Sequence, residues 1–98
     1  MELRGEQLGP GSVVGGYRID ELISRGGMGV VYRVTNVALN RICALKVLRP
    51  EFAADEQFRA RFMREMRIAA SLNNLNIVGI HHAGEHEGML YFVMDYVT

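Results

Sequence analysis

Runs of β-branched and aromatic residues, separated by glycine and asparagine turns, predict five β-strands along this chain. The predicted strands cover residues 17–24, 30–36, 41–48, 77–83 and 89–97. A glycine-rich connection over 25–29 joins the first two, a turn over 36–40 joins the next two, and a turn over 85–88 joins the last two. Because these connections are short, the strands that they join are expected to run antiparallel.

One amphipathic helix is predicted over residues 56–72, with Asp55 as its N-cap. Its apolar stripe repeats at intervals of three and four residues, the spacing of one helix face, and consists of Phe58, Phe62, Ala69 and Leu72. Position 65 completes the same stripe but is a glutamate. A buried carboxylate is unstable unless a cation meets it, so we expect Glu65 to be buried and paired.

The predicted order, three strands, a helix and two strands, indicates an α+β fold, in which a five-stranded antiparallel sheet carries one packed helix. Residues 1–16 contain five glycines and Pro10, and we expect them to form a flexible lead-in. A short edge strand at Val13 and Val14 is the one element that this segment offers. We therefore divide the chain into a lead-in over 1–16 and a folded unit over 17–98.

Composition and charge exclude several classes of function. The chain has 98 residues, enough for one small domain or a part of a larger one, and 49% of them are hydrophobic. Eleven basic and eleven acidic residues cancel, so no overall field favours nucleic acid or an anionic membrane. The N-terminus lacks the apolar segment of a signal peptide, and no run is long enough to span a membrane. We expect this portion of the chain to be cytoplasmic.

The cysteine and histidine residues offer no metal site. Cys43 is the only cysteine, so no intramolecular disulfide can form and no zinc-type spacing exists. His81 and His82 are adjacent on a predicted strand and should point to opposite faces, with His86 in the following turn. Four arginines crowd the predicted helix, and we interpret them as a solvated face: Arg59, Arg61, Arg64 and Arg67.

Lys46 is the only lysine in a chain with ten arginines. A lysine is a compact point charge on a flexible stem, whereas an arginine is a broad planar fork. A site that must fit a small cation between phosphate oxygens and a carboxylate can therefore require lysine. Lys46 lies on a predicted buried strand, and the arginines of the helix fall off its apolar stripe, so Lys46 is the expected partner of Glu65.

The glycine-rich connection over residues 25–29 suits a phosphate, because its backbone N–H groups lack side chains that would block an approach. It is not a dinucleotide-binding turn, which would lead into a helix. Nor is it a Walker loop, because Val30 and Val31 follow Gly29 in place of the Lys and Ser/Thr of that motif.

Together these parts resemble the N-terminal lobe of a protein kinase, most like those of the bacterial serine/threonine kinases. Residues 24–31 (SRGGMGVV) match the glycine-rich motif of the family, and residues 43–46 (CALK) match its Val-Ala-Ile-Lys motif. The segment that ends at Glu65 resembles the αC helix. Residues 76–78 resemble the entry to the fourth family strand, and 91–97 the fifth strand running into the hinge. The likeness extends from Tyr17 to the last residue.

This resemblance implies a binding site for ATP. Lys46 would hold the α- and β-phosphates while paired to Glu65, and these two are the implied catalytic residues. Met94 would occupy the gatekeeper position at the back of the pocket. The residues implied to contact the nucleotide are Ile23, Ser24, Gly26, Gly27, Gly29, Val31, Ala44, Lys46, Met94, Asp95, Tyr96 and Val97. Ser24 departs from the family pattern, which has glycine there.

The same resemblance implies a serine/threonine protein kinase whose further parts are not in these 98 residues. No His-Arg-Asp, Asp-Phe-Gly or Ala-Pro-Glu occurs in them, so Mg²⁺ and the catalytic base would come only with a C-terminal lobe. Protein substrates would be partners of the whole enzyme. This chain alone is expected to bind nucleotide weakly and to be inactive.

Alternatives from other classes remain open. A stand-alone module would transfer nothing and would use its open sheet or helix surfaces for partners or self-association, which a concentration-dependent mass in solution would reveal. A pseudokinase would carry a second lobe without base or metal ligands. A purely structural glycine-hairpin domain would show no saturable competition by ATP.

Overall fold

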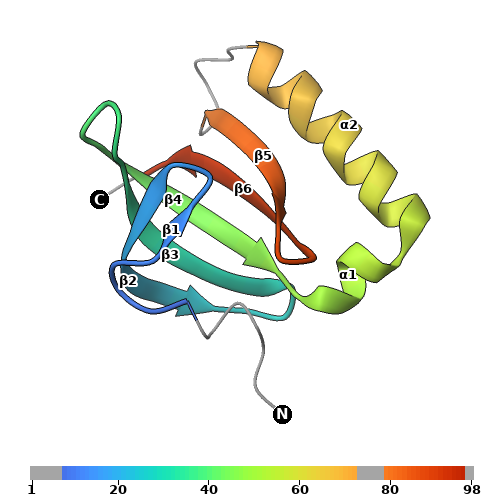
Figure 1. Ribbon diagram of the computed structural model, residues 1–98. Helices are drawn as coiled ribbons and strands as arrows, with labels where there is room; N and C mark the ends of the chain where they lie inside the picture. The colour runs from blue at the N-terminus through green and yellow to red at the C-terminus, as the bar shows by residue number, and fades with distance from the viewer. Residues whose placement is uncertain (1–7, 73–78, 97–98) are drawn as a thin grey trace.

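The computed structural model describes residues 8–72 and 79–96. Within them, six strands form one curled antiparallel sheet in the order β1-β2-β3-β4-β6-β5 (Figure 1). The strands are β1 (Val13–Val14), β2 (Tyr17–Arg25), β3 (Gly29–Asn36), β4 (Arg41–Leu48), β5 (Ile80–His86) and β6 (Met89–Asp95). Helices α1 (Pro50–Ala54) and α2 (Glu56–Leu72) follow β4. The α+β fold with a helix packed on an antiparallel sheet is confirmed, with a sixth strand.

The sixth strand is β1, the short edge strand that was expected at Val13 and Val14 within the lead-in. Val14 pairs with Tyr17 across a tight hairpin and is 1% exposed, so it belongs to the core. The turn uses Gly15 and Gly16 at φ 56° and 90°, a backbone region that glycine enters without strain. The edge strand expected at Val13 and Val14 is therefore confirmed, and the two glycines that follow it form its turn.

The described helices and strands agree with the sequence at most of their ends. The strand over 41–48 and the helix over 56–72 have the predicted bounds. Asp55 caps α2 as expected, since its Oδ1 accepts the N–H groups of Gln57 and Phe58 at 3.0 and 3.1 Å. Strand β5 continues to His86, beyond its predicted end at residue 83, because the turn is confined to Glu87 and Gly88 at φ 49° and 81°. Residues 77 and 78 lie outside the described residues.

Helix α1 was not predicted, since a proline directly after a strand also fits a chain that simply leaves the sheet. Proline is equally suited to the first turn of a helix, where its missing N–H is not needed, and Pro50 takes that position here. The short helix places Ala53 in the core and connects β4 to α2. It thereby fixes where α2 can reach the sheet.

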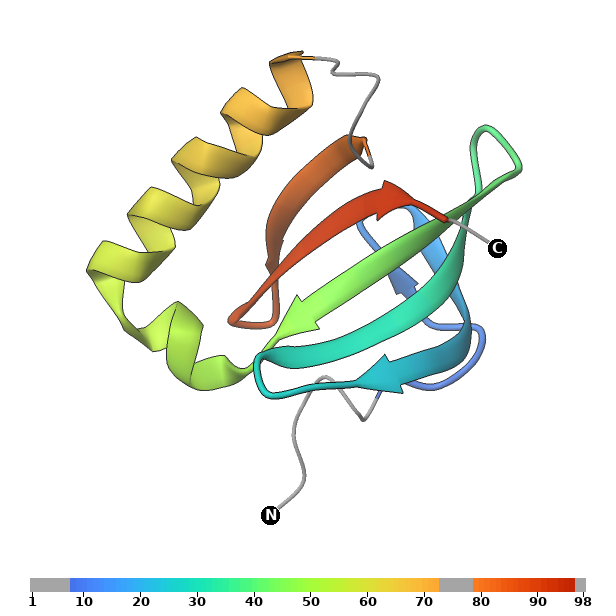
Figure 2. The ribbon, with the colours of Figure 1, turned by 180° about the vertical axis from the view of Figure 1, so that it is seen from behind.

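The core consists of two clusters on opposite faces of the sheet. The first is enclosed by the curl of the strands and contains Val14, Tyr17, Ile19, Val30, Tyr32, Val34, Cys43, Leu45, Val47, Met89, Tyr91 and Val93. The second lies under the helices and contains Leu48, Ala53, Phe62 and Leu90, with the half-buried Phe52, Phe58, Met63, Met66, Ala83 and Phe92 against it. Figure 2 shows α2 running along the β5 edge, away from β2 and β3.

The expected burial of Glu65 is wrong. Phe62 is buried as predicted, but Met63 and Met66 are the residues after it on α2 that pack on the second cluster, and Glu65 is exposed. Residues 62 and 66 are four apart and so share a face. Turning the helix to bury methionine avoids the cost of burying a carboxylate. The side chain of Leu72 lies outside those that the structure describes.

The remaining surface features of the helices are simple. The four arginines of α2 are exposed, which confirms the interpretation of a solvated face. Arg59 pairs with Glu85 of β5 at 3.5 Å, and Arg61 lies over the ring of Phe58. Neither helix in the described part of the chain is long and apolar enough to cross a membrane.

We expect the Cys43 thiol to be unreactive in the folded chain. It is 2% exposed, and burial raises its pKa, so the reactive thiolate is disfavoured. Reaction with a chromogenic disulfide reagent should be at least about tenfold slower in native buffer than in guanidinium chloride. Equal rates in the two solutions would contradict the burial of this residue.

Candidate functional site

Lys46 lies in the middle of the sheet, on the face that also carries the helices. It stands directly opposite Val31 of β3 and Phe92 of β6, and residues opposite one another in antiparallel strands share a face. Its neighbours Leu45 and Val47 belong to the first core cluster on the other face. Lys46 is half-buried, and it forms no ion pair within the part of the chain that the structure describes.

Ala44 and Met94 form the next row on the same face, opposite one another on β4 and β6. Ala44 is buried and Met94 is half-buried. Val31 and Ala44 are therefore neighbours of Lys46 on one surface, as the sequence suggested. The small side chain of Ala44 leaves space above the strand that a larger residue would fill.

The glycine-rich hairpin lies at the end of β4, close to Lys46 in the strand. Gly29 stands opposite Leu48, and the N–H of Arg49 donates to the carbonyl of Met28 at 2.9 Å. Gly26 closes the turn by donating its N–H to the carbonyl of Gly29 at 2.8 Å. Residues 24–28 are exposed, so this backbone is open to a ligand.

Of the hairpin glycines Gly26, Gly27 and Gly29, only Gly29 is required by close packing against the neighbouring strand. A Cβ atom on Gly29 would overlap the carbonyl oxygen of Val47 and lie 2.9 Å from the Cα atom of Leu48. A Cβ atom on Gly27 would meet nothing within 4 Å, and one on Gly26 would only touch Gly29. Gly29 is therefore needed for the packing of the sheet itself, whereas Gly26 and Gly27 leave the surface of the loop open.

Strand β2 carries two further residues that are implied to contact the nucleotide, Ile23 and Ser24, next to this hairpin. Ser24 stands opposite Val31, and Ile23 lies at a register shift between Leu22 and Ser24. Ile23 is 45% exposed, in the part of β2 that extends beyond its pairing with β1. It forms an uncovered apolar rim beside the hairpin.

The structure does not bring Lys46 and Glu65 together. No ion pair joins them among the described residues, and Glu65 is exposed on α2. The reason lies in the packing, because α2 contacts β5 and α1, while the strand that carries Lys46 lies further into the sheet (Figure 1). The expected pairing of the two residues is absent from this arrangement.

The last predicted contacts lie where β6 ends. Asp95 and Tyr96 are half-buried, and Val97 lies outside the described residues. The Asp95 carboxylate accepts hydrogen bonds from His81 Nε2 at 2.5 Å and from the N–H of Gly79 at 3.1 Å. These bonds, that of His81 above all, lower the pKa of Asp95. The family resemblance implied only that Asp95 contacts the nucleotide, and nothing in the local sequence pattern indicated these partners.

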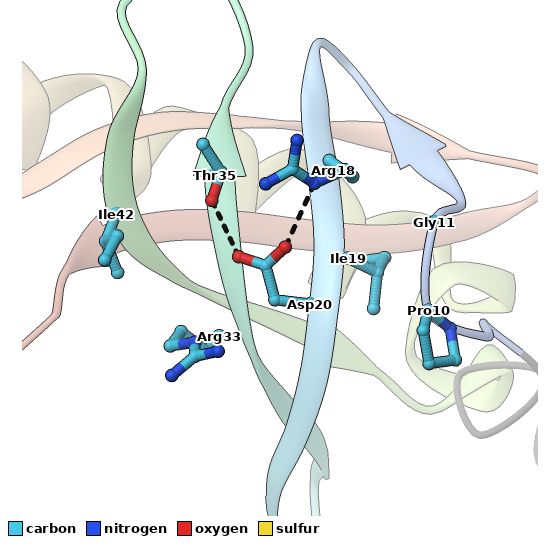
Figure 3. A pocket seen from close by; sticks show the side chains of 8 residues that line it. All are labelled: Pro10, Gly11, Arg18, Ile19, Asp20, Arg33, Thr35 and Ile42. Atoms are coloured by element: carbon cyan, nitrogen blue, oxygen red, sulfur yellow. Dashed lines mark hydrogen bonds and ion pairs between the residues drawn. The ribbon is translucent and has the colours of Figure 1, made fainter.

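A separate cavity of about 610 Å³ opens beside β2 and β3 (Figure 3), whereas α2 contacts β5 at the other edge of the sheet. Asp20 lies in its wall and accepts hydrogen bonds from Thr35 Oγ1 at 2.7 Å and Arg18 Nε at 3.1 Å. The Thr35 bond above all lowers the pKa of Asp20. None of the predicted site residues lines this cavity, and its carboxylate is satisfied by neighbouring side chains. The residues around Lys46 remain the candidate site on chemical grounds.

Comparisons with known proteins agree on one family. The profile of the protein kinase domain matches residues 17–98. The serine/threonine-protein kinase PknJ of Mycobacterium tuberculosis is 48% identical over 91 residues, and PrkC of Bacillus subtilis is 42% identical over 85 residues. These matches cover 93% and 87% of this chain but only 15% and 13% of the two relatives.

A solved structure shows the same fold. The crystal structure of the M. tuberculosis PknI kinase domain superposes with a TM-score of 0.86 at 41% identity. The match covers 92% of this chain and 36% of that one. The sheet and helices described above therefore correspond to about a third of that kinase domain.

Proposed function

Since this chain belongs to the protein kinase family, we propose that it forms the ATP-binding half of a serine/threonine protein kinase. The complete enzyme would transfer the γ-phosphoryl group of ATP to serine or threonine hydroxyls of proteins. Its relatives carry the name serine/threonine-protein kinase, and the protein kinase match over residues 17–98 supports the proposal. This part of the enzyme would lie in the cytoplasm, whether or not other parts anchor it to a membrane.

The observation that carries the proposal is the setting of Lys46. It is the only lysine of the chain, half-buried on the central strand β4, beside an open glycine hairpin and without a carboxylate partner among the described residues. A half-buried ammonium group without a partner favours an anionic ligand. A phosphate chain above the hairpin would supply the missing negative charge.

The neighbouring side chains fit the rest of the nucleotide. Val31, Ala44 and the exposed Ile23 would form an apolar surface over adenine, and Met94 would bound it at the back. The backbone of residues 95–97 would hydrogen-bond the edge of the base, and Ser24, Gly26, Gly27 and Gly29 would let the hairpin approach the phosphates. Mg²⁺ would be held by residues outside these 98 and would neutralise charge on the phosphates.

The separation of Lys46 from Glu65 in this structure implies that the helix must move before the enzyme is active. Family chemistry requires a carboxylate from the helix to hold the lysine against the phosphates. We propose that α2 must approach β4 before transfer occurs, and that the described arrangement precedes this step. The exposed position of Glu65 supports the proposal, since a solvated carboxylate can change partners without a desolvation penalty.

Titration of the ¹⁵N-labelled chain with ATP, followed by NMR, tests the nucleotide site. We expect saturable shifts of the amide signals of residues 24–31 and 43–46, and their loss in Lys46→Ala. Arg67→Ala is the matched control, because it removes one positive charge from an exposed position on α2. Identical titrations of wild type and Lys46→Ala would contradict the role of Lys46, and no shifts in wild type would contradict nucleotide binding by this chain.

A further inference from the structure

The Asp95 side chain ties together three segments that are distant in the sequence. Its Oδ2 accepts the N–H of Gly79, and its Oδ1 accepts His81 Nε2 and lies 3.6 Å from the guanidinium of Arg41. Its backbone N–H donates to the carbonyl of Gly79 at 3.0 Å. The entry to β5, the start of β4 and the end of β6 therefore meet at one carboxylate.

The chain around Asp95 is shaped for these contacts. The register of β5 and β6 shifts between Ile80 and His82, so that His81 is an extra residue in its strand. Such bulges redirect a side chain, and here the redirected imidazole reaches Asp95. A Cβ atom on Gly79 would lie 3.1 Å from Asp95 Oδ2, closer than most such contacts. A glycine at position 79 therefore leaves space for the carboxylate.

We propose that Asp95 is a positioning residue that holds the backbone at the end of β6 in place for the adenine base. This inference rests on the proposed nucleotide-binding function. Asp95 begins the segment whose backbone would meet the edge of the base, and its side chain is tied to other strands. Hydrogen bonds to an adenine edge need donors and acceptors at fixed distances. The end of a strand that no side chain holds in place would move and would not keep these distances.

The charged and titratable groups around Asp95 determine the pH range over which these contacts are present. The groups that face it are His81 of β5, Arg41 of β4 and the thiol of Cys43, which stands opposite Asp95 on β4. Its pKa is lowered in the folded chain. A carboxylate with a lowered pKa contributes stability above its unfolded pKa, and that contribution is lost as the pH falls through the folded value. The contacts are therefore complete at neutral pH and fail only in acid.

A pH titration of the wild-type chain by NMR tests the contacts without any nucleotide. The amide proton signal of Gly79 should shift as Asp95 becomes protonated, with a midpoint below that of an ordinary aspartate. In His81→Gln the midpoint should rise, because the hydrogen bond from the His81 imidazole lowers the pKa of Asp95 more than any other contact and is removed. A Gly79 signal that does not respond to this titration would overturn the inference.

Ligand affinities test the positioning role. Asp95→Ala should weaken ATP binding by about threefold to tenfold, the range expected for lost hydrogen bonds, and should leave the affinity for inorganic tripolyphosphate unchanged. Tripolyphosphate lacks the base, so it does not sense the strand end. Asp95→Asn should show a smaller loss, because its amide oxygen can still accept the N–H of Gly79. Glu51→Ala, which removes an exposed carboxylate from α1, is the control and should match wild type.

The outcomes separate this inference from the proposed function. Wild type that binds ATP, with Asp95→Ala and Asp95→Asn binding it equally well, would overturn the positioning role alone. Equal weakening of ATP and tripolyphosphate would also overturn it, since that result indicates a general loss of structure. Wild type that binds neither ligand would overturn the proposed function and the positioning role with it, whatever the Gly79 titration shows.

Discussion

Replacing Lys46 by methionine in the full-length polypeptide that carries these residues is expected to reduce phosphoryl transfer by at least about a hundredfold. Methionine has a similar length and fits the half-buried position on β4, but it carries no charge to meet the phosphates. The rate of transfer from radiolabelled ATP to a serine- or threonine-containing protein measures the effect. Arg67→Met, which removes an exposed charge from α2, should retain the wild-type rate.

Glu65→Gln in the same assay separates the resting arrangement from the active one. Glu65 is exposed and unpaired with Lys46 in the described structure, so the substitution should leave the free energy of unfolding nearly unchanged. Activity should nevertheless fall sharply, because the neutral amide cannot anchor the ammonium group. Full activity in Lys46→Met would refute the assignment of Lys46, and full activity in Glu65→Gln would remove Glu65 from the mechanism.

Gly29→Ala is expected to destabilise the folded chain by about 2–4 kcal/mol, in the upper range for single substitutions. The added methyl group would overlap the backbone of β4 at Val47 and Leu48, and a backbone, unlike a flexible side chain, cannot move aside without disturbing the sheet. Urea unfolding followed by circular dichroism gives the difference in free energy.

Gly27→Ala is the matched control, because a methyl group there meets nothing within 4 Å. Its free energy of unfolding should lie within about 0.5 kcal/mol of wild type. Equal stabilities of the two variants would show that Gly29 has no packing role and that its glycine serves the ligand alone. The comparison thereby distinguishes the structural glycine of the hairpin from those available for binding.

Most of the fold could be predicted from the chain because its signals are local. Alternating β-branched residues and tight turns mark β2, β3 and β4, and Asp55 followed by an apolar period marks α2. The family likeness rests on short motifs around Gly26 and Lys46, whose spacing can be read without coordinates. These features depend on residues a few positions apart, so the sequence contains them in full.

The errors share one cause, which is that local patterns allow more than one packing. Glu65 and Met66 are neighbours on α2, and either one completes an apolar stripe that includes Phe62. The approach of the helix to β5 through α1 selects methionine. The local pattern likewise predicted a strand at Val14 but not its burial, because the curl of the sheet that encloses Val14 joins residues far apart in the sequence.

The amino-acid sequence alone identifies the strands, the capped helix, the glycine hairpin and a single lysine on a central strand. Which side chains contact one another is determined only by the tertiary structure. It separates Lys46 from Glu65, makes Gly29 indispensable to the sheet and gathers Gly79, His81 and Arg41 around Asp95. Propensity and periodicity act over a few residues, whereas these contacts join residues that only the register of β4, β5 and β6 brings within reach.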